Sequence, residues 1–348
     1  WSRGLGDVYK RQSLSRVGQS TALPANQSKG NRVELDQGTT VQFGPLPIEE
    51  RGAGAMFYKT QFNGYSVKFS PYNEGRIAVA TAQNFGIIGN GRQYVLDVTP
   101  QGLREVAAFD TVDGLYDCTW CEANENVLAS ASGDGSVKVW DIAAPPQMNP
   151  IRSFEEHGHE VYCVNWNLVN RDCFLSASWD DTIKLWNLQS PGSLRTFAEH
   201  RYCCYAVAWC PTNGETFASA SGDCTLKLWD IRQPASTLTI RAHEFEVLSC
   251  DWNKYEDFTL VTGSVDKTMR VWDIRQPSVP VRIMPGHNYA VRKVICSPHA
   301  GNLVASCSYD MTVCFWDIKA PGENVCPSSP YRLGDQSTHQ MPPENKAS

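Results

Sequence analysis

The chain has 348 residues, of which 42% are hydrophobic, and a formal net charge of −6 at pH 7. This composition is ordinary for a globular protein with a large core, and the lack of a basic excess argues against nucleic acid as the main partner. No apolar run reaches the roughly 18 residues of a membrane helix, so no membrane span is predicted.

The two ends of the chain differ in composition from the middle. Residues 1–55 have no hydrophobic periodicity and many Gly, Ser, Gln and Arg residues, which is typical of disorder. We expect them to be a disordered or non-native extension. Residues 56–319 are expected to form one folded domain. Residues 320–348 are rich in Pro, Ser, Gly and Gln, which predicts a disordered tail.

Repeated hexapeptides divide the middle region. SVKVWD, TIKLWN, TLKLWD, TMRVWD and TVCFWD each hold a tryptophan, and successive tryptophans are 46, 43, 43 and 44 residues apart. A weaker copy, RQYVLD, places Leu96 another 44 residues before Trp140. A period near 44 that ends in Trp-Asp is typical of a β-propeller with one four-stranded blade per repeat. The sequence therefore predicts an all-β propeller with about six blades.

Within each repeat the pattern predicts three clear strands and a short fourth one. In the first repeat these are residues 65–70, 76–81 and 92–98, which alternate or consist of apolar residues. Gly-Asp, Asp-Asp and Asp-Lys steps before the third strands predict tight hairpins. The string GIIGNG at residues 86–91 precedes a strand, so it predicts a hairpin rather than a phosphate-binding loop.

The thirteen cysteines lie mostly within strand-like segments, which predicts buried free thiols in a reducing compartment. Cys118 and Cys121 form the one CxxC pair and have no second pair beside them. A zinc site needs four such ligands, so we expect no metal and no cofactor.

Four repeats share a His, a Ser, an Asp and a Trp. The His precedes the Asp by 23 residues and the Trp by 29. One such set alone would suggest a hydrolase triad, but four identical copies favour a structural network in which buried polar groups satisfy one another. The predicted sets are His157, Ser178, Asp180 and Trp186; His200, Ser221, Asp223 and Trp229; His243, Ser264, Asp266 and Trp272; and His287, Ser308, Asp310 and Trp316.

This pattern resembles the Asp, His, Ser and Trp tetrad of the WD-repeat family. The strings FNGYSVKFSPY, AVATAQNFGIIGNG and SPHAGNLVASCSYDMTV further resemble the cytosolic receptors for the type-2 peroxisomal targeting signal, the seventh peroxins, over residues 62–317. The resemblance implies a seven-bladed propeller without enzymatic activity that works in the cytoplasm and cycles to the peroxisome. Its cargo would be peroxisomal matrix proteins that carry an N-terminal amphipathic signal: an Arg-Leu pair, five residues, then His or Gln and Leu. The implied partners are a co-receptor, such as a long form of the type-1 signal receptor, and peroxisomal docking proteins.

The resemblance also implies a cargo site. Asp113, in VDGLYD, and Glu160, in HEVYCVNW, are expected to hold the cargo arginine, since two carboxylates from adjacent blades suit one guanidinium. Trp179 and Tyr309 immediately precede tetrad aspartates and are expected to line a groove for the apolar face of the cargo helix. The alternatives are solvated rim charges for the acids and aromatics that cover their own hairpins.

The resemblance ends after Asp317, where a seventh blade is expected. The strand expected near residues 56–60, which would close the ring against that blade, is left without a partner, so the sequence predicts an open ring from a truncated or alternatively spliced product. The alternative functions are a WD-repeat scaffold that binds histone tails in chromatin and an inactive truncated isoform.

Overall fold

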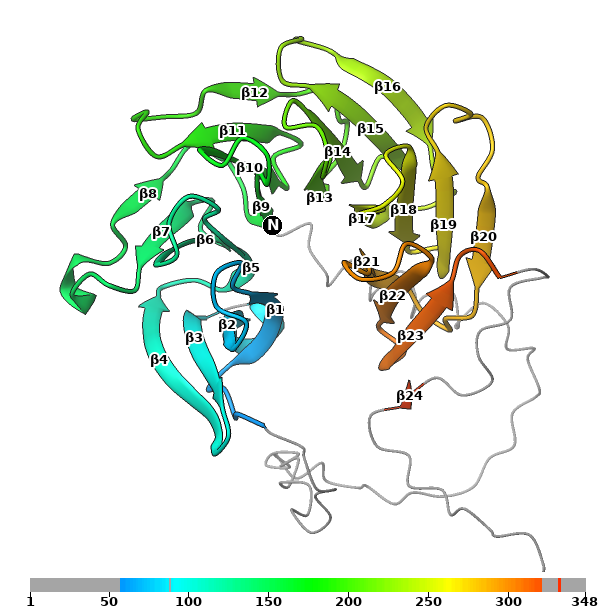
Figure 1. Ribbon diagram of the computed structural model, residues 1–348. Helices are drawn as coiled ribbons and strands as arrows, with labels where there is room; N and C mark the ends of the chain where they lie inside the picture. The colour runs from blue at the N-terminus through cyan, green and yellow to red at the C-terminus, as the bar shows by residue number, and fades with distance from the viewer. Residues whose placement is uncertain (1–56, 88, 321–330, 333–348) are drawn as a thin grey trace, which may run out of the picture.

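A computed structural model describes residues 57–87, 89–320 and 331–332. The predicted extension 1–55 and almost all of the tail therefore lie outside the described residues. The described chain forms six four-stranded antiparallel sheets, which follow one another around a central axis (Figure 1). This confirms the predicted all-β propeller of six blades.

Each sheet runs from an inner strand to an outer strand in chain order. The first three sheets consist of β1 (Asn63–Phe69), β2 (Arg76–Ala82), β3 (Gly91–Thr99) and β4 (Gly102–Thr111); β5 (Leu115–Trp120), β6 (Val127–Ser132), β7 (Val137–Asp141) and β8 (Arg152–Phe154); and β9 (Val161–Trp166), β10 (Cys173–Ser178), β11 (Ile183–Asn187) and β12 (Arg195–Phe197). The other three consist of β13 (Cys204–Trp209), β14 (Thr216–Ser221), β15 (Thr225–Asp230) and β16 (Ser236–Arg241); β17 (Val247–Trp252), β18 (Thr259–Ser264), β19 (Thr268–Asp273) and β20 (Arg282–Pro285); and β21 (Val291–Cys296), β22 (Leu303–Ser308), β23 (Thr312–Asp317) and β24 (Tyr331–Arg332).

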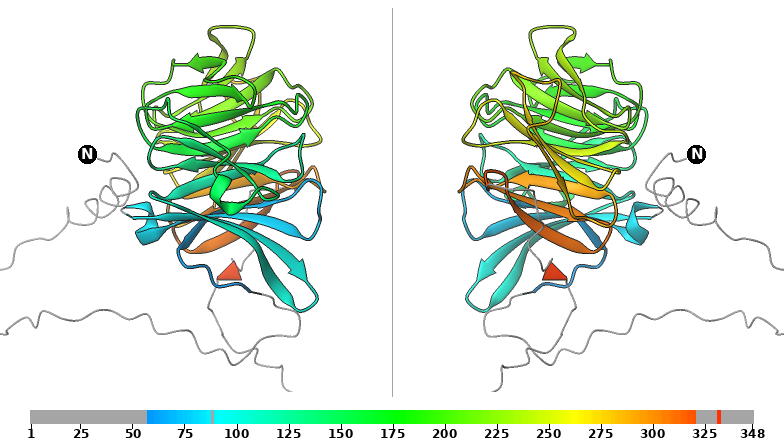
Figure 2. Two further views of the ribbon diagram at one scale, coloured as in Figure 1. Left: turned by 90° about the vertical axis from the view of Figure 1, so that its left-hand side faces the viewer. Right: turned by 90° about the vertical axis from the view of Figure 1, so that its right-hand side faces the viewer.

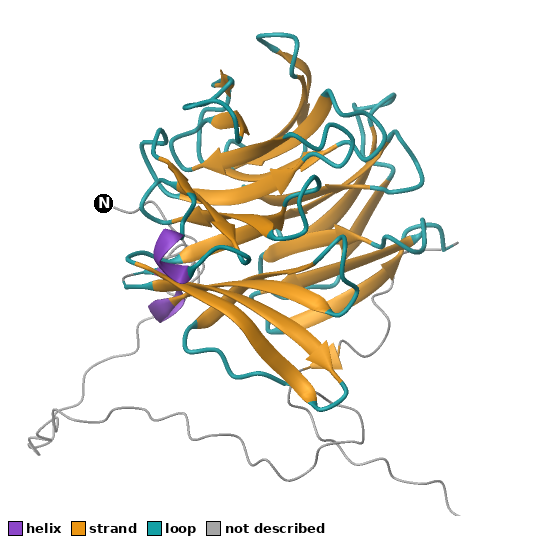
Figure 3. Cartoon of the chain, turned by 60° about the vertical axis from the view of Figure 1, so that its left-hand side comes forward, coloured by secondary structure: helices purple, strands orange, loops and turns teal. Residues whose placement is uncertain are grey.

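Helical structure among the described residues is limited to two short 3-10 segments, η1 (Gln83–Gly86) and η2 (Pro146–Met148) (Figure 3). Neither is long and apolar enough to cross a membrane, and the described residues hold no other helix that could.

The core lies between the sheets, where apolar side chains of one sheet meet those of the next. Strand β6 is buried along its whole length. Tryptophans near the ends of the inner strands also reach back to the preceding sheet: the Nε1–H groups of Trp120, Trp209 and Trp252 donate to Lys68 O, Asn165 O and Ala208 O at 3.0–3.1 Å. These bonds satisfy the buried indole donors and fix each sheet against its neighbour.

The predicted hairpins between second and third strands are present. In five of them the residue after the tetrad Asp, or its equivalent, has a positive φ: Gly135, Asp181, Cys224, Lys267 and Met311. In four of these five places a residue with a side chain is held in the left-handed region, which such residues rarely adopt.

The ring ends at its first and sixth sheets, and no described sheet lies between them (Figure 1). Phe69 on β1 is 69% exposed, whereas Trp120, its equivalent in the second sheet, is 3% exposed. On the sixth sheet Phe315 is 47% exposed, whereas the equivalent Val139 is completely buried. The two end faces thus expose apolar side chains that neighbouring sheets cover elsewhere. Figure 2 shows the backbone of the sheets from two sides.

Residues 57–60 form no strand. Tyr58 instead packs edge-on against Tyr94 of the first sheet, with 5.9 Å between ring centroids. One element was missed by the sequence prediction: Val313 of β23 pairs with Tyr331 of β24, so two residues of the tail supply the outer strand of the sixth sheet.

Candidate functional site at the channel mouth

In each sheet, the inner strand has one residue without a partner on the second strand. The register shift falls between Gly64 and Ser66 in β1 and recurs at the same place in the other five sheets. Such β-bulges redirect a side chain and increase the local twist. The six extra residues, which we call the bulge ring, are Tyr65, Tyr116, Tyr162, Tyr205, Leu248 and Arg292.

The bulge ring lies on the inner strands around the propeller axis, at one end of the central channel; we call this end the channel mouth. Its ring centroids are 5.2 Å apart for Tyr65 and Tyr116, 5.2 Å for Tyr116 and Tyr162, and 5.7 Å for Tyr162 and Tyr205. The guanidinium of Arg292 lies 4.6 Å from the ring of Tyr162. Aromatic contacts at these distances are favourable. The bulge ring therefore forms a packed, mainly aromatic layer at the channel mouth, which we call the floor. The repeat pattern did not reveal this ring, although its members stand second or third in every observed inner strand.

Asp113 lies in the loop that leads into β5, at the edge of this floor. Its carboxylate accepts a hydrogen bond from Gly114 N at 2.7 Å. Burial raises the pKa of Asp113, the bond from Gly114 opposes this, and the nearby Asp134 adds to the rise. A Cβ on Gly133 would lie 2.7 Å from Asp113 Oδ1. A side chain at position 133 would therefore collide with the Asp113 carboxylate, and glycine avoids this collision.

Glu160 lies in the equivalent loop of the next sheet. Its backbone carbonyl accepts from Trp179 N at 3.0 Å, while its side chain is partly exposed. Burial is the main cause that raises the pKa of Tyr116, and Asp113 and Glu160 both contribute to the rise. The two carboxylates, from the loops that precede adjacent sheets, therefore both raise the pKa of the Tyr116 phenol. Neither has a cationic partner at ion-pair distance among residues 57–87 and 89–320.

Trp179 and Tyr309 are also placed at the floor. The indole of Trp179 stacks on Tyr162, with centroids 5.1 Å apart and an interplanar angle of 26°. Trp179 is 8% exposed and packs with Tyr309 in one apolar cluster with the bulge ring. Trp179 Nε1 and Tyr309 Oη are buried and form no hydrogen bond to a described residue. Both aromatics thus belong to the floor; Trp179 exposes little of its surface, whereas Tyr309 is partly exposed.

The exposed apolar side chains of this face stand on the loops around the floor. The loops that join second to third strands, and those that join one sheet to the next, lie at the same end of the antiparallel sheets. They carry Phe85, Val112, Phe245 and Met311, all of which are largely exposed. The face therefore combines two unpaired carboxylates with an apolar periphery, an arrangement that suits an amphipathic, basic peptide.

The four tetrads are present, with one correction. His157 Nδ1 donates to Asp180 Oδ2 at 2.8 Å, and its Nε2 accepts from Ser176 Oγ at 2.7 Å. Ser176 Oγ in turn accepts from Trp186 Nε1 at 2.8 Å. The predicted Ser178 instead donates to His159 O and accepts from Asp180 N.

The same correction applies in the other three sheets. The residue between His and Trp is Ser219, Thr262 or Ser306, not the predicted Ser221, Ser264 or Ser308. Residues two apart on a strand face the same side, so alternation alone could not choose between them. The hydroxyls of the network are buried; Ser176, for example, is completely so, which suits a structural role rather than attack on a substrate.

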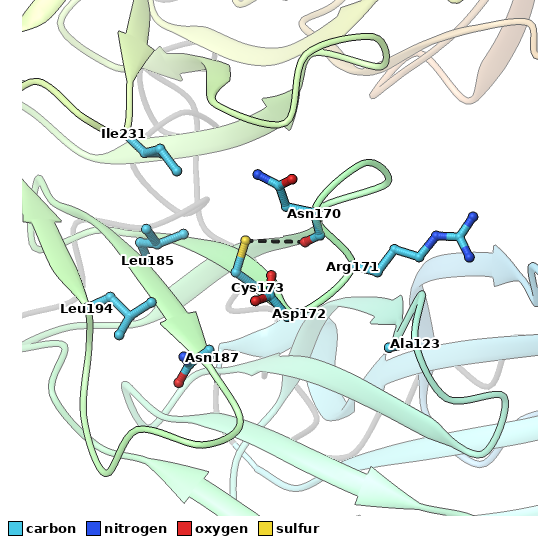
Figure 4. Close-up of a pocket in the computed structure, with 9 residues that line it drawn as sticks. All are labelled: Ala123, Asn170, Arg171, Asp172, Cys173, Leu185, Asn187, Leu194 and Ile231. Atoms are coloured by element: carbon cyan, nitrogen blue, oxygen red, sulfur yellow. Dashed lines mark hydrogen bonds between the residues drawn. The ribbon is translucent and has the colours of Figure 1, made fainter.

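A separate pocket of about 540 Å³ lies on the opposite face of the ring, among loops of the second to fourth sheets (Figure 4). Leu185, Leu194 and Ile231 form its apolar side, and Cys173 Sγ donates to Asn170 O at 3.4 Å beside it. The pocket is remote from the channel mouth and shares no residue with the predicted cargo site. The twelve described cysteines are free thiols, and most of them are buried, as predicted.

Comparison with known protein families identifies the repeats of this chain. The WD domain, G-beta repeat family matches residues 110–141, 148–187, 192–230, 234–273 and 278–317. Each of these five matches begins before or within the outer strand of one sheet and ends with the third strand of the next. The match therefore follows sequence repeats that are offset from the sheets.

Of three named relatives, two match over most of the chain and one over a third of it. The peroxisomal targeting signal 2 receptor of Dictyostelium discoideum is 64% identical over 260 residues, which are 75% of this chain and 82% of that protein. Peroxisome biogenesis protein 7 of Arabidopsis thaliana is 65% identical over 254 residues, 72% of this chain and 80% of that protein. The human peroxisomal targeting signal 2 receptor is 46% identical over 114 residues, 33% of this chain and 35% of that protein. The chain belongs to the family of peroxisomal targeting signal 2 receptors, which here takes the form of a WD-repeat propeller.

Proposed function

We propose that this chain is an import receptor that binds the N-terminal type-2 targeting signal of peroxisomal matrix proteins and, with a co-receptor, delivers them to the peroxisome. It would act in the cytoplasm, cycle to the peroxisome, and contact a long form of the type-1 signal receptor and docking proteins there. The main support is the family membership. The observation on the molecule itself that favours it is the pair of unpaired carboxylates, Asp113 and Glu160, on adjacent sheets beside Tyr116.

In this proposal the cargo arginine lies between Asp113 and Glu160. Both carboxylates are partly shielded from water, so a charge-assisted hydrogen bond to a guanidinium would be stronger than at a fully exposed site. The leucines of the signal would contact the apolar loops that carry Phe85, Val112 and Phe245. Such a receptor needs no catalytic group, and none is assigned.

A binding experiment tests the proposal. The full chain, with co-receptor, is expected to retain a reporter that carries the type-2 signal and to release the same reporter when the signal arginine is changed to alanine. Equal retention of both reporters would overturn the proposal. A histone-tail peptide is the matched control for the chromatin-scaffold alternative, and preferential retention of that peptide would favour it instead.

A further inference from the structure

Arg292 is the one cation in the bulge ring, where four sheets place a tyrosine and one places a leucine. Its guanidinium lies over the ring of Tyr162, on the far side of the channel mouth, at 4.6 Å from the centroid. A cation–π contact of this kind stabilises a partly buried arginine, but it leaves most of the five N–H donors of a guanidinium without an acceptor.

The other shielded arginines have oxygen partners. Arg76 Nε donates to Asp97 Oδ1 at 2.7 Å. Arg270 donates to Ala242 O at 2.9 Å and to Asp266 Oδ2 at 3.3 Å. Across residues 57–87 and 89–320, no carboxylate comes within ion-pair distance of Arg292.

The groups that influence the charge of Arg292 also include no strong carboxylate contribution. The pKa of Arg292 is raised on balance: burial lowers it, but Tyr162, Tyr309, Cys307 and Tyr65 raise it, and none of these groups is a carboxylate. Tyr309 itself has a buried hydroxyl without a hydrogen bond to any described residue. Arg292 as a whole residue is partly exposed, as a subsite for an external anion requires.

We propose that Arg292 is a carboxylate-binding subsite at the centre of the peptide-binding face and takes an Asp or Glu side chain of the docked signal peptide. The face would then recognise opposite charges at two places: a basic residue at Asp113 and Glu160, and an acidic residue at Arg292. The five residues between the Arg-Leu pair and the His-Leu pair would supply the acid. This proposal rests on the proposed function, because it assumes that the signal docks on this face.

The test uses the full chain and fluorescent type-2 signal peptides in which each of the five intervening residues is, in turn, Glu or Gln. A hydrogen-bonded charge pair predicts that Glu at one of the positions tightens binding about tenfold relative to Gln. The preference should vanish in Arg292→Gln and fall in Arg292→Lys, which keeps the charge but not the planar fork. Arg201→Gln is the matched control, because Arg201 is exposed on a loop of the same face; it should keep the preference.

A second measurement does not depend on the signal peptide. The Nε–Hε NMR signal of Arg292, assigned by its loss in Arg292→Lys, should shift progressively with sodium acetate, more than with sodium chloride, while that of Arg201 does not. If no peptide binds, the proposed function fails, and the acetate titration still decides on the subsite. The subsite is overturned if acetate has no effect on Arg292, or if no position prefers Glu, or if the preference persists in Arg292→Gln.

Discussion

Asp113 and Glu160 give the sharpest prediction at the scale of single residues. Neither carboxylate has a cation at ion-pair distance in the described structure, and both raise the pKa of Tyr116. Removing one partner of a shielded charge pair costs about 2–5 kcal/mol of binding free energy, so Asp113→Ala or Glu160→Ala should weaken cargo binding strongly. Lys at either position should be worse than Ala, because it repels the cargo arginine. Titration calorimetry with the signal peptide measures these effects.

The double variant separates a shared site from two independent ones. If both carboxylates contact one guanidinium, the double variant should cost less than the sum of the single changes. The melting temperature is the control and should stay nearly constant, since neither carboxylate holds together other parts of the protein. Full cargo affinity in both single variants would show that these are ordinary rim charges.

Gly133→Ala tests the same site without changing a charge. A methyl group there would lie 2.7 Å from Asp113 Oδ1, which is too close for unbonded atoms, so the carboxylate must move. We expect cargo affinity to fall, although less than in Asp113→Ala. The matched control is Gly64→Ala, since a Cβ on Gly64 meets nothing within 4 Å. Unchanged affinity in Gly133→Ala would mean that the position of Asp113 is not important for binding.

At the scale of strands and hairpins, periodicity predicted the elements well but not the roles within them. The expected strand at residues 92–98 is β3 (Gly91–Thr99), and the Asp-containing steps do form tight hairpins. The tetrad hydroxyl was misplaced by two residues, because Ser176 and Ser178 face the same side of β10. Only the pairing register, which sets Ser176 beside Trp186 and His157, separates them.

The bulge ring shows a further limit of pattern analysis. A bulge breaks the alternation of a strand at the point where it turns a side chain toward the channel. Tyr162, for example, belongs to an apolar run and looks like any other core residue. Its contacts with Tyr116, Tyr205 and Arg292 depend on how separate sheets meet, which no single repeat encodes.

The tetrad of the fifth sheet predicts a pH-dependent stability. His243→Ala would leave Thr262 Oγ1 and Asp266 Oδ2 without their histidine partner, which costs about 1–3 kcal/mol of unfolding free energy. Burial lowers the pKa of His243, although Asp266 opposes this. The folded state therefore binds fewer protons than the unfolded state just below the unfolded pKa of about 6.5.

It follows that the stability contributed by His243 is complete above about pH 6.5 and declines as the pH falls toward the lowered pKa of the folded state. The stability difference between the parent chain and His243→Ala, from urea unfolding, should thus be smaller at about pH 5.5 than at about pH 7.5. Trp272→Phe, which removes the indole donor but keeps the histidine, is the control, and its cost should not change with pH in this window. Loss of cargo binding in His243→Ala with unchanged melting would contradict the structural role.

At the scale of the whole molecule, the number of sheets followed from the repeat period, whereas the outer strand of the sixth sheet did not. Tyr331 and Arg332 lie in a segment without strand periodicity, and only their pairing with Val313 and Thr312 identifies them. The first sheet lies outside the matched WD domain segments, apart from the last two residues of β4. Its strands were nevertheless predicted, because Leu96 keeps the repeat spacing without the tryptophan.

The two ends of the ring lead to the last prediction. Val67 and Phe69 on the first sheet and Phe315 on the sixth are largely exposed, although their equivalents in other sheets are buried. Exposed apolar faces of this kind favour association, so the parent chain should self-associate in a concentration-dependent manner. Replacing Phe69 and Phe315 together with Thr should reduce that association and change the unfolding free energy little, because both side chains contact water in the folded state.

Size-exclusion chromatography with light scattering across a concentration series distinguishes the possibilities. The control is Phe245→Thr, which removes a comparably exposed aromatic from the proposed peptide-binding face and should leave association unchanged. If association depends on the ring ends, only the double variant lowers the mean mass. A parent chain that stays monomeric at every concentration would contradict the prediction, since its apolar end faces must then be covered by other segments of the same chain.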